Sequence, residues 1–162
     1  LYLTAANTAT GLLKLFRYDG TTFRQITNFF PAGSDVVSQF VHYNNVTYFS
    51  GSIDGLTKLY ADNGTEVTQV SDLNPGSPDV PASPMVYNNR LWLSAYGPNN
   101  RAKLFRFDGT TFVQMLDLMG DEQHDAPSAL LVHDDALFLS IVNRGGVSKL
   151  HRICEASAGC TP

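Results

Sequence analysis

The chain has 162 residues and a formal net charge of −4; 43% of its residues are hydrophobic and 16% are charged. That apolar share is enough for the core of a single domain, and the dispersed basic residues do not form the stripe expected of a nucleic-acid-binding protein. No apolar run approaches the ~20 residues that a membrane-spanning helix needs, so we expect no membrane-spanning segment.

The sequence repeats itself at intervals close to 45 residues. The segment Lys14–Phe23 returns almost unchanged as Lys103–Phe112 and more weakly as Lys58–Val67, and a fourth copy begins at Lys149. The lysines that open these segments are 44, 45 and 46 residues apart. A period of this length is typical of folds that place one small structural unit after another. Because Leu1 already reads as part of a strand, we expect further residues upstream of it.

We expect four repeat units, and each complete unit reads as four short strands. The units cover about residues 1–33, 34–77, 78–122 and 123–162. In the second unit the expected strands are Ser38–Tyr43, Val46–Gly51, Thr57–Asp62 and Glu66–Ser71. The first and last units each show three strands, which makes fourteen in all.

Two kinds of turn separate the strands of a unit. Pairs of Asn or Asp end the first strand and favour a tight turn, because both residue types tolerate a positive φ; they are Asn44-Asn45, Asn88-Asn89 and Asp134-Asp135. A second set of pairs predicts type I′ hairpin turns between the third and fourth strands: Asp19-Gly20, Asn63-Gly64 and Asp108-Gly109.

The strands are apolar on both faces, as Leu91-Trp92-Leu93 illustrates, which suits a sheet that lies between two other sheets. Four-stranded antiparallel units of 44–46 residues with this pattern predict an all-β fold built from β-propeller blades, of which about 3.5 are present. Since propellers usually close as rings of about four to eight blades, we expect a single propeller region over 1–162 that is either part of a longer chain or closed by association of several copies.

One pattern runs through nearly the whole chain, up to about Arg152. It consists of an Asn-Pro-Gly-Ser linker, a Leu-aromatic-Leu-Ser strand and a Leu-aromatic pair before Asp-Gly-Thr, and it is clearest from Asp72 to Thr110. The pattern resembles the ELWxxDGT repeat of bacterial secreted and cell-surface proteins, although Lys-Leu-Phe or Lys-Leu-Tyr replaces Glu-Leu-Trp here. The resemblance implies an extracellular or cell-surface propeller without an assigned reaction.

The repeat also carries basic residues at fixed places. Lysine precedes the repeated leucine in all four copies, and arginine follows that leucine by two residues at Arg17, Arg106 and Arg152. Such a series could line a channel that attracts anions. The preferred interpretation is architectural, through ion pairs between strands and packing of the side-chain stems.

Cys154 and Cys160 are the only two cysteines. A disulfide between them across an expanded hairpin tip suits an oxidising compartment and would stabilise the fold by about 2 kcal/mol. A metal pair is less favoured, because no other Cys or His motif lies near them. Two formal glycosylation sequons begin at Asn45 and Asn63; both fall at expected turns, and in a bacterial protein they would be turn chemistry only.

Four further residues are candidates for ligand binding. Asp121, Glu122 and Asp125 lie in the most polar loop of the chain and could bind Ca²⁺ through their carboxylates, although a solvated loop is the favoured interpretation. Tyr96 could stack on a sugar, whereas Trp92 occupies a core position of the repeat.

No catalytic motif is present: the sequence has no Gly-x-Ser-x-Gly elbow, no His-Glu-x-x-His and no phosphate-binding loop. We therefore expect no enzyme and no cofactor, but a structural, adhesive or protein-interaction module whose partners are further blades, other copies of the chain, glycans or surface proteins. A lectin-like propeller is one alternative, and a propeller enzyme with its site on blades outside this sequence is another.

Overall fold

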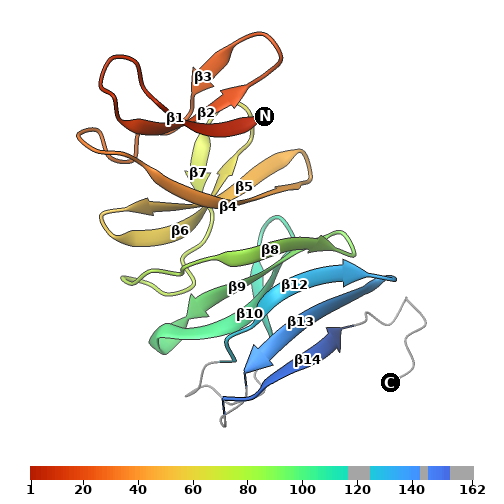
Figure 1. Ribbon diagram of the computed structural model, residues 1–162. Coiled ribbons are helices and arrows are strands. Elements are labelled where there is room, and N and C mark those ends of the chain that lie inside the picture. The colour runs from red at the N-terminus through yellow and green to blue at the C-terminus, as the bar shows by residue number, and fades with distance from the viewer. Residues whose placement is uncertain (117–124, 143–145, 154–162) are drawn as a thin grey trace.

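The computed structural model describes residues 1–116, 125–142 and 146–153. Over these ranges the chain forms fourteen β-strands and one 3₁₀ turn, η1 (Pro98–Asn100), and the strands make four small antiparallel sheets (Figure 1). The all-β class and the fourteen strands, grouped as three, four, four and three, are as the sequence predicts.

The strands of each sheet follow one another in chain order. Sheet A contains β1 (Tyr2–Ala6), β2 (Leu13–Tyr18) and β3 (Phe23–Gln25). Sheet B contains β4 (Val36–Tyr43), β5 (Val46–Ile53), β6 (Leu56–Asp62) and β7 (Val67–Gln69). Sheet C contains β8 (Ala82–Tyr87), β9 (Arg90–Gly97), β10 (Arg101–Phe107) and β11 (Phe112–Leu116). Sheet D contains β12 (Ser128–His133), β13 (Ala136–Val142) and β14 (Ser148–Ile153).

The paired Asn and Asp residues form tight turns, as predicted. Tyr43 faces Val46 across β4 and β5, so Asn44 and Asn45 alone make the connection, with φ values of 50° and 61°. The pairs Asn88-Asn89 and Asp134-Asp135 repeat this geometry, again with a positive φ at both residues. Two consecutive positive φ values are what a type I′ turn requires.

The Asp-Gly turns differ from the prediction. Asp19 does not have a positive φ, so the loop between β2 and β3 is not a two-residue type I′ turn; it contains four residues and ends at the pair Tyr18 and Phe23. The Asp19 carboxylate closes this loop by accepting hydrogen bonds from the backbone N–H groups of Thr21 (2.8 Å) and Thr22 (2.9 Å). Asp and Asn side chains can hydrogen-bond to nearby backbone N–H groups and so stabilise a loop other than the two-residue hairpin turn. The loop at Asp19 is stabilised in this way.

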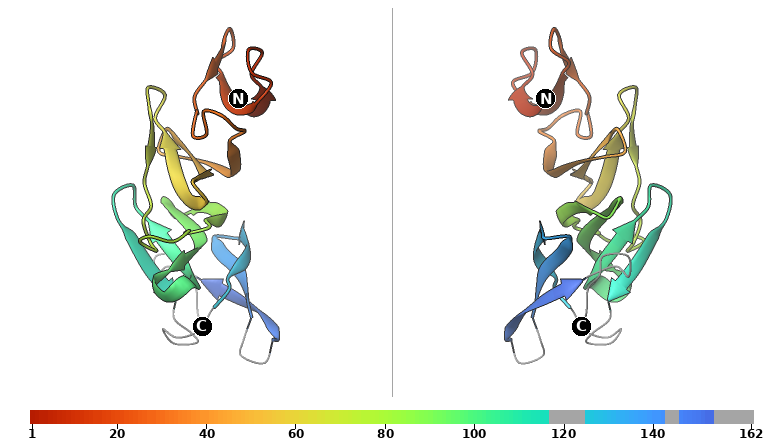
Figure 2. Two further views of the ribbon diagram at one scale, coloured as in Figure 1. Left: turned by 90° about the vertical axis from the view of Figure 1, so that its left-hand side faces the viewer. Right: turned by 90° about the vertical axis from the view of Figure 1, so that its right-hand side faces the viewer.

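The sheets follow one another along the molecule in the order A, B, C, D. The first strand of sheet C, β8, lies beside the first strands of its two neighbours, β4 and β12. Sheets A and D lie at opposite ends of the row, and the side views show each sheet turned relative to the one before it (Figures 1 and 2). Within the described residues the row is open, because sheet D does not meet sheet A.

A bulge interrupts the first strand of sheets B, C and D at the same place. The irregular segments are Ser38 to Val41, Ala82 to Met85 and Ser128 to Leu131. Each contains one non-glycine residue with a positive φ: Gln39 (57°), Ser83 (50°) and Ala129 (50°). The bulges of neighbouring sheets touch, since the Ser83 N–H donates to Gln39 Oε1 at 2.9 Å. Bulges of this kind bend a strand and re-aim its side chains.

The core is divided into three clusters, and each cluster lies between two consecutive sheets. One strand of every sheet carries the repeated Leu-aromatic pair, in which His replaces the aromatic residue once: Leu15-Phe16 on β2, Leu59-Tyr60 on β6, Leu104-Phe105 on β10 and Leu150-His151 on β14. We call the side of the sheet that bears this leucine its leucine face and the opposite side its aromatic face. Between sheets A and B, Leu15 packs with Phe49 and Tyr60. The leucine face of one sheet therefore packs on the aromatic face of the next, and the other two clusters follow the same rule.

Candidate functional site

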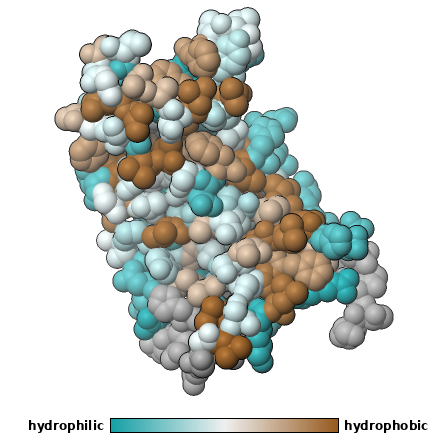
Figure 3. All heavy atoms as spheres, viewed as in Figure 1, coloured by the Kyte–Doolittle hydropathy of each residue, from teal (hydrophilic) through white to brown (hydrophobic). Residues whose placement is uncertain are grey.

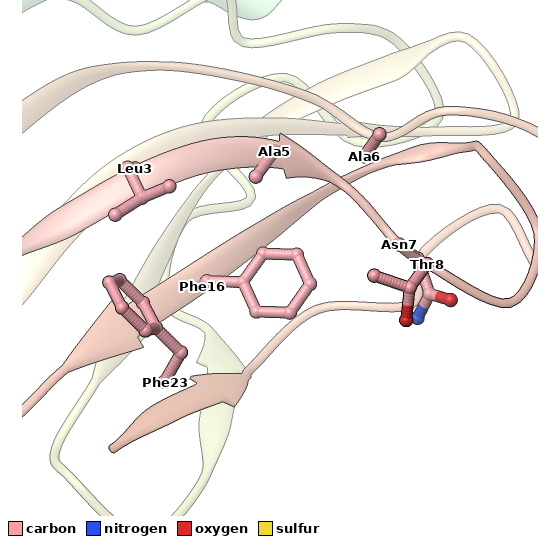
Figure 4. Close-up of a pocket in the computed structure, with 7 residues that line it drawn as sticks. All are labelled: Leu3, Ala5, Ala6, Asn7, Thr8, Phe16 and Phe23. Carbon is pink, nitrogen blue, oxygen red and sulfur yellow. The ribbon is translucent and has the colours of Figure 1, made fainter. Parts of the chain in front are cut away.

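Among the described residues, no sheet covers the aromatic face of sheet A. It carries an apolar pocket of about 300 Å³, lined by Leu3, Ala5, Ala6, Asn7, Thr8, Phe16 and Phe23. Leu3 and Ala5 on β1 point toward the ring of Phe16 on β2, and the Phe23 ring from β3 lies beside it (Figure 4). Phe23 is 61% exposed. An apolar hollow with so little polar lining can hold an apolar side chain, and it offers no reacting group.

The leucine face of sheet D is the second uncovered surface, at the other end of the row. Leu150 on β14 is 75% exposed, whereas its counterparts Leu15, Leu59 and Leu104 are all 0% exposed. Leu131 on β12 is 57% exposed. Leu131 and Phe138 lie opposite one another in the register of β12 and β13, and Phe138 lies opposite Arg152 of β14, so these side chains share one face. Apolar residues gather over the region of β12 and β13 in the space-filling view (Figure 3).

Polar contacts at the rims of the interfaces also recur. Arg17 of sheet A binds sheet B through Nη1 to Asp62 Oδ2 (3.0 Å) and through Nη2 to the Gly64 carbonyl oxygen (2.7 Å). The Tyr2 hydroxyl donates to the same carboxylate at 2.9 Å. Burial raises the pKa of the Tyr2 phenol, and the neighbouring Asp62 charge raises it further, so this hydroxyl keeps its proton and stays a donor.

A second recurring contact involves the tyrosine that ends the first strand. The Tyr43 hydroxyl of sheet B donates to the carbonyl oxygens of Asn89 (3.0 Å) and Asp108 (3.3 Å) in sheet C. The Tyr87 hydroxyl of sheet C donates to the carbonyl oxygen of Asp135 in sheet D at 2.9 Å. Each hydroxyl thus links the turn of one sheet to the turn of the next.

The repeated lysines are buried and form ion pairs with aspartates that enter the next sheet. Nζ–Oδ distances are 3.1 Å for Lys14 and Asp35, 2.8 Å for Lys58 and Asp79, and 3.4 Å for Lys103 and Asp125. Each of these aspartates precedes the first strand of the following sheet. The architectural interpretation of the lysines is therefore confirmed for these three. The fourth, Lys149, is exposed on β14.

The acceptors around Lys58 show what these lysines can do chemically. Its Nζ reaches Asp72 Oδ1 (2.7 Å), Asp79 Oδ1 (2.8 Å) and the Asn74 carbonyl oxygen (3.1 Å), which uses all three ammonium protons. Burial alone would lower the pKa of Lys58, but its hydrogen bonds to Asp72 and Asp79 more than offset this, and the pKa is raised. Lys58 therefore stays charged and is not an amine nucleophile or a general base at neutral pH.

The structure describes two of the four residues that the sequence singled out for ligand binding. Tyr96 is half-buried in β9, and its backbone N–H donates to the Asp79 carbonyl oxygen at 2.6 Å. Asp125 is fully buried against Lys103. Asp121 and Glu122 lie outside the described residues, as do Cys154 and Cys160. The calcium loop and the disulfide stay predictions.

In the described ranges, no group of three or more His, Cys, Asp or Glu side chains is placed to hold a metal ion. No helix in the same part of the chain is long and apolar enough to span a membrane.

Two aspartates of the ion pairs, Asp35 and Asp79, are residues that reasoning from the sequence missed. A signal for them is present, because Asp35 and Asp79 both follow the repeated lysine by 21 residues. Each also accepts a backbone N–H of the connecting loop at Oδ1: Phe30 N–H for Asp35 and Asn74 N–H for Asp79. A search for acidic residues that share the period of the lysines would have found them.

Comparison with known proteins gives no relative: no protein-family model, curated protein or solved structure matches this chain.

Proposed function

We propose that this chain is a non-catalytic β-propeller module that serves as a structural, adhesive or protein-interaction unit outside the cell or at its surface. The propeller assignment is supported by four consecutive antiparallel sheets of three or four strands, each packed face to face on the next, and by the first strands β4, β8 and β12, which lie side by side. Sheets arranged radially around their first strands are the defining feature of propellers.

The observation that carries the interaction role is the pair of uncovered apolar faces. Interior sheets bury the repeated leucine completely, whereas sheet D leaves Leu150 exposed and sheet A leaves an apolar pocket open. Uncovered apolar surfaces of this kind mark sites where another protein surface binds. The extracellular location is supported by the resemblance of the repeat to ELWxxDGT proteins.

The experiment that tests this function uses intact cells that produce the protein. An antibody raised against residues 1–162 is expected to label unpermeabilised cells, and external protease is expected to remove the label. Deletion of the segment is expected to weaken attachment of the cells to surfaces or to one another. Labelling only after permeabilisation, or a measured hydrolytic or transfer activity in the purified chain, would contradict the proposal.

The lectin-like alternative predicts a different result in the same cells. Purified chain would then bind defined oligosaccharides on a glycan array, and Tyr96→Ala would abolish that binding. The half-buried position of Tyr96 in β9 gives a sugar-stacking role no added support. A matched variant, Tyr18→Ala, tests whether loss of any tyrosine has the same effect.

A further inference from the structure

We propose that the leucine face of sheet D in one copy of this chain packs on the aromatic face of sheet A in a second copy, with Leu150 seated in the pocket beside Leu3 and Phe16. The inference rests on the proposed function as an interaction module. It goes beyond that function by naming the partner, the two surfaces and their relative direction.

The internal interfaces show what covers each kind of face. Leu59 of sheet B is buried against Leu93 and Phe105 of sheet C, which occupy the repeat positions of Leu3 and Phe16. Leu15 is buried in the same way against the counterparts of those two residues in sheet B. Leu104 is buried against sheet D, where Leu139 stands at the position of Leu3. A leucine face and an aromatic face of this repeat therefore fit one another in three independent cases within one chain.

The two uncovered faces are the missing halves of a fourth such interface. Sheet D presents Leu150 where the other sheets present their buried leucine. Sheet A presents a hollow of about 300 Å³ where sheets B and C receive that leucine. Among the described residues, sheet D and sheet A lie at opposite ends of the row and do not cover each other. A second copy of the chain carries both matching surfaces, an aromatic face on its sheet A and a leucine face on its sheet D.

The polar rim of the internal interface predicts one further contact. Arg17 of sheet A binds the carbonyl oxygen of Gly64 and the carboxylate of Asp62, both in sheet B. The corresponding residues in the proposed contact are Arg152, which is exposed on β14, and Gly20 of the second copy. Tyr18 stands at the position of Asp62 in sheet A, so the proposed contact keeps the charge-assisted hydrogen bond to the carbonyl oxygen but not the ion pair.

The hydrogen bond that Tyr43 makes across an internal interface also has an equivalent in the proposed contact, at His133. Tyr43 of sheet B donates its hydroxyl to the carbonyl oxygen of Asp108 in sheet C. His133 takes the place of Tyr43 in sheet D, and Asp19 of the second copy takes the place of Asp108. The His133 side chain is 69% exposed in the single chain and is free to make this contact while it stays near Asp134.

The two faces differ from one another, so the contact runs head to tail. Such a contact closes a ring if the rotation between copies allows it and otherwise continues as an open series. Two copies contain eight sheets, which is at the upper end of the usual propeller range of about four to eight blades.

Light scattering after size exclusion tests the contact on the chain itself. We expect a mass of two chains of 17.7 kDa, or larger multiples that grow with concentration. Leu150→Asp and Phe23→Asp each remove one face and are expected to give monomers; both side chains are exposed, so the circular dichroism spectrum should not change. Val113→Asp, at an exposed apolar residue of β11 away from both faces, is the matched control and should associate normally.

Mixing the Leu150→Asp and Phe23→Asp variants tests whether the contact between copies runs head to tail. Each variant keeps the face that the other has lost, so a head-to-tail contact predicts that the mixture forms dimers and nothing larger. Arg152→Glu is expected to weaken association roughly tenfold. Monomeric wild-type chain at about 100 μM, or dimers formed by either single variant alone, would overturn the proposal. A monomer that still labels the surface of intact cells would overturn only this contact and leave the proposed function standing.

Discussion

Lys58 Nζ lies 2.8 Å from Asp79 Oδ1, and this pair joins the third strand of sheet B to the loop that enters sheet C. Both side chains are buried, and Asp79 also accepts hydrogen bonds from Ser71 Oγ (2.6 Å) and from the backbone N–H groups of Leu73 (3.2 Å) and Asn74 (2.9 Å). One carboxylate therefore holds both the lysine and the loop between the sheets.

Lys58→Met is expected to lower the free energy of unfolding by about 3–5 kcal/mol, because it leaves the Asp79 carboxylate buried without its countercharge. Urea denaturation measures the loss. Lys149→Met is the matched control: this lysine has the same place in the repeat but is exposed, so its replacement should change stability by less than about 0.5 kcal/mol. Equal effects of the two substitutions would contradict the structural role of the pair.

Gly51→Ala is expected to destabilise the interface between sheets A and B by about 1–3 kcal/mol, which is the usual cost of overpacking. A Cβ at this position would lie 2.7 Å from Phe29 Cε2 and 2.9 Å from Tyr60 Cδ2. Thermal or urea unfolding measures the change.

The interface between sheets B and C indicates a second substitution that should restore the stability of Gly51→Ala. Ala95 stands at the position of Gly51 in sheet C and packs in one cluster with Leu73, which takes the place of Phe29. Gly51→Ala combined with Phe29→Leu reproduces that arrangement. The double variant should therefore be more stable than Gly51→Ala alone, and a further loss of stability would show that the clash is not with Phe29.

The aspartates of the two Asp-Gly-Thr-Thr loops are expected to make stability depend on acid. Backbone N–H groups of Thr22 and Thr21 hold the pKa of Asp19 well below its usual range, and those of Thr111 and Thr110 lower the pKa of Asp108. A carboxyl whose folded pKa is depressed stabilises the fold above its unfolded pKa of about 3.9 and loses that contribution as the pH falls through the folded pKa.

The double variant Asp19→Asn/Asp108→Asn removes this titration and keeps the loop, as Asn63 already does in sheet B, where its Oδ1 accepts from Thr65 N–H at 2.9 Å. The wild-type chain should exceed the variant in stability at pH 5, and the difference should shrink between pH 5 and pH 2. Urea midpoints over that range provide the measurement. A difference that stays constant would assign the low pKa values no part in folding.

Tyr43→Phe and Tyr87→Phe are each expected to lower stability by about 0.5–1.5 kcal/mol, the usual net contribution of one hydrogen bond. Each substitution removes a hydroxyl that links consecutive sheets while the ring stays in the core. Tyr18→Phe is the control, because its hydroxyl is exposed and donates within its own loop, to the Gly20 carbonyl oxygen. Chemical denaturation of the three variants should separate the first two from the third.

The strands and the Asn or Asp turns were predictable from the sequence because they depend on local chemistry. The repeated segments between turn residues predict β4 to β7 within a few residues, and the positive φ at Asn44 and Asn45 suits the residue type. The wrong prediction for the Asp19 loop has a local cause too. The two threonines after the glycine provide N–H and hydroxyl donors that draw the carboxylate inward, and the Asp-Gly pair alone does not reveal them.

The remaining features depend on contacts between sheets, which no single repeat contains. The partner of Lys58 is an aspartate in the next connection, so the strand that carries the lysine does not identify it. The positive φ at Gln39, Ser83 and Ala129 falls on residue types that do not favour it, and the packing of adjacent first strands maintains it. Asp125 looked like part of a polar loop and proved to be the third member of the buried series.

The ion pairs also determine where this chain can be cut without leaving a buried charge. Each lysine belongs to one sheet and its aspartate to the segment that leads into the next sheet, so a truncation at the edge of a sheet removes the aspartate and leaves its ammonium group unpaired. A segment that ends just after one of these aspartates keeps its last pair. Truncations that end after Asp35, Asp79 or Asp125 should therefore express as folded protein more readily than truncations that end before them.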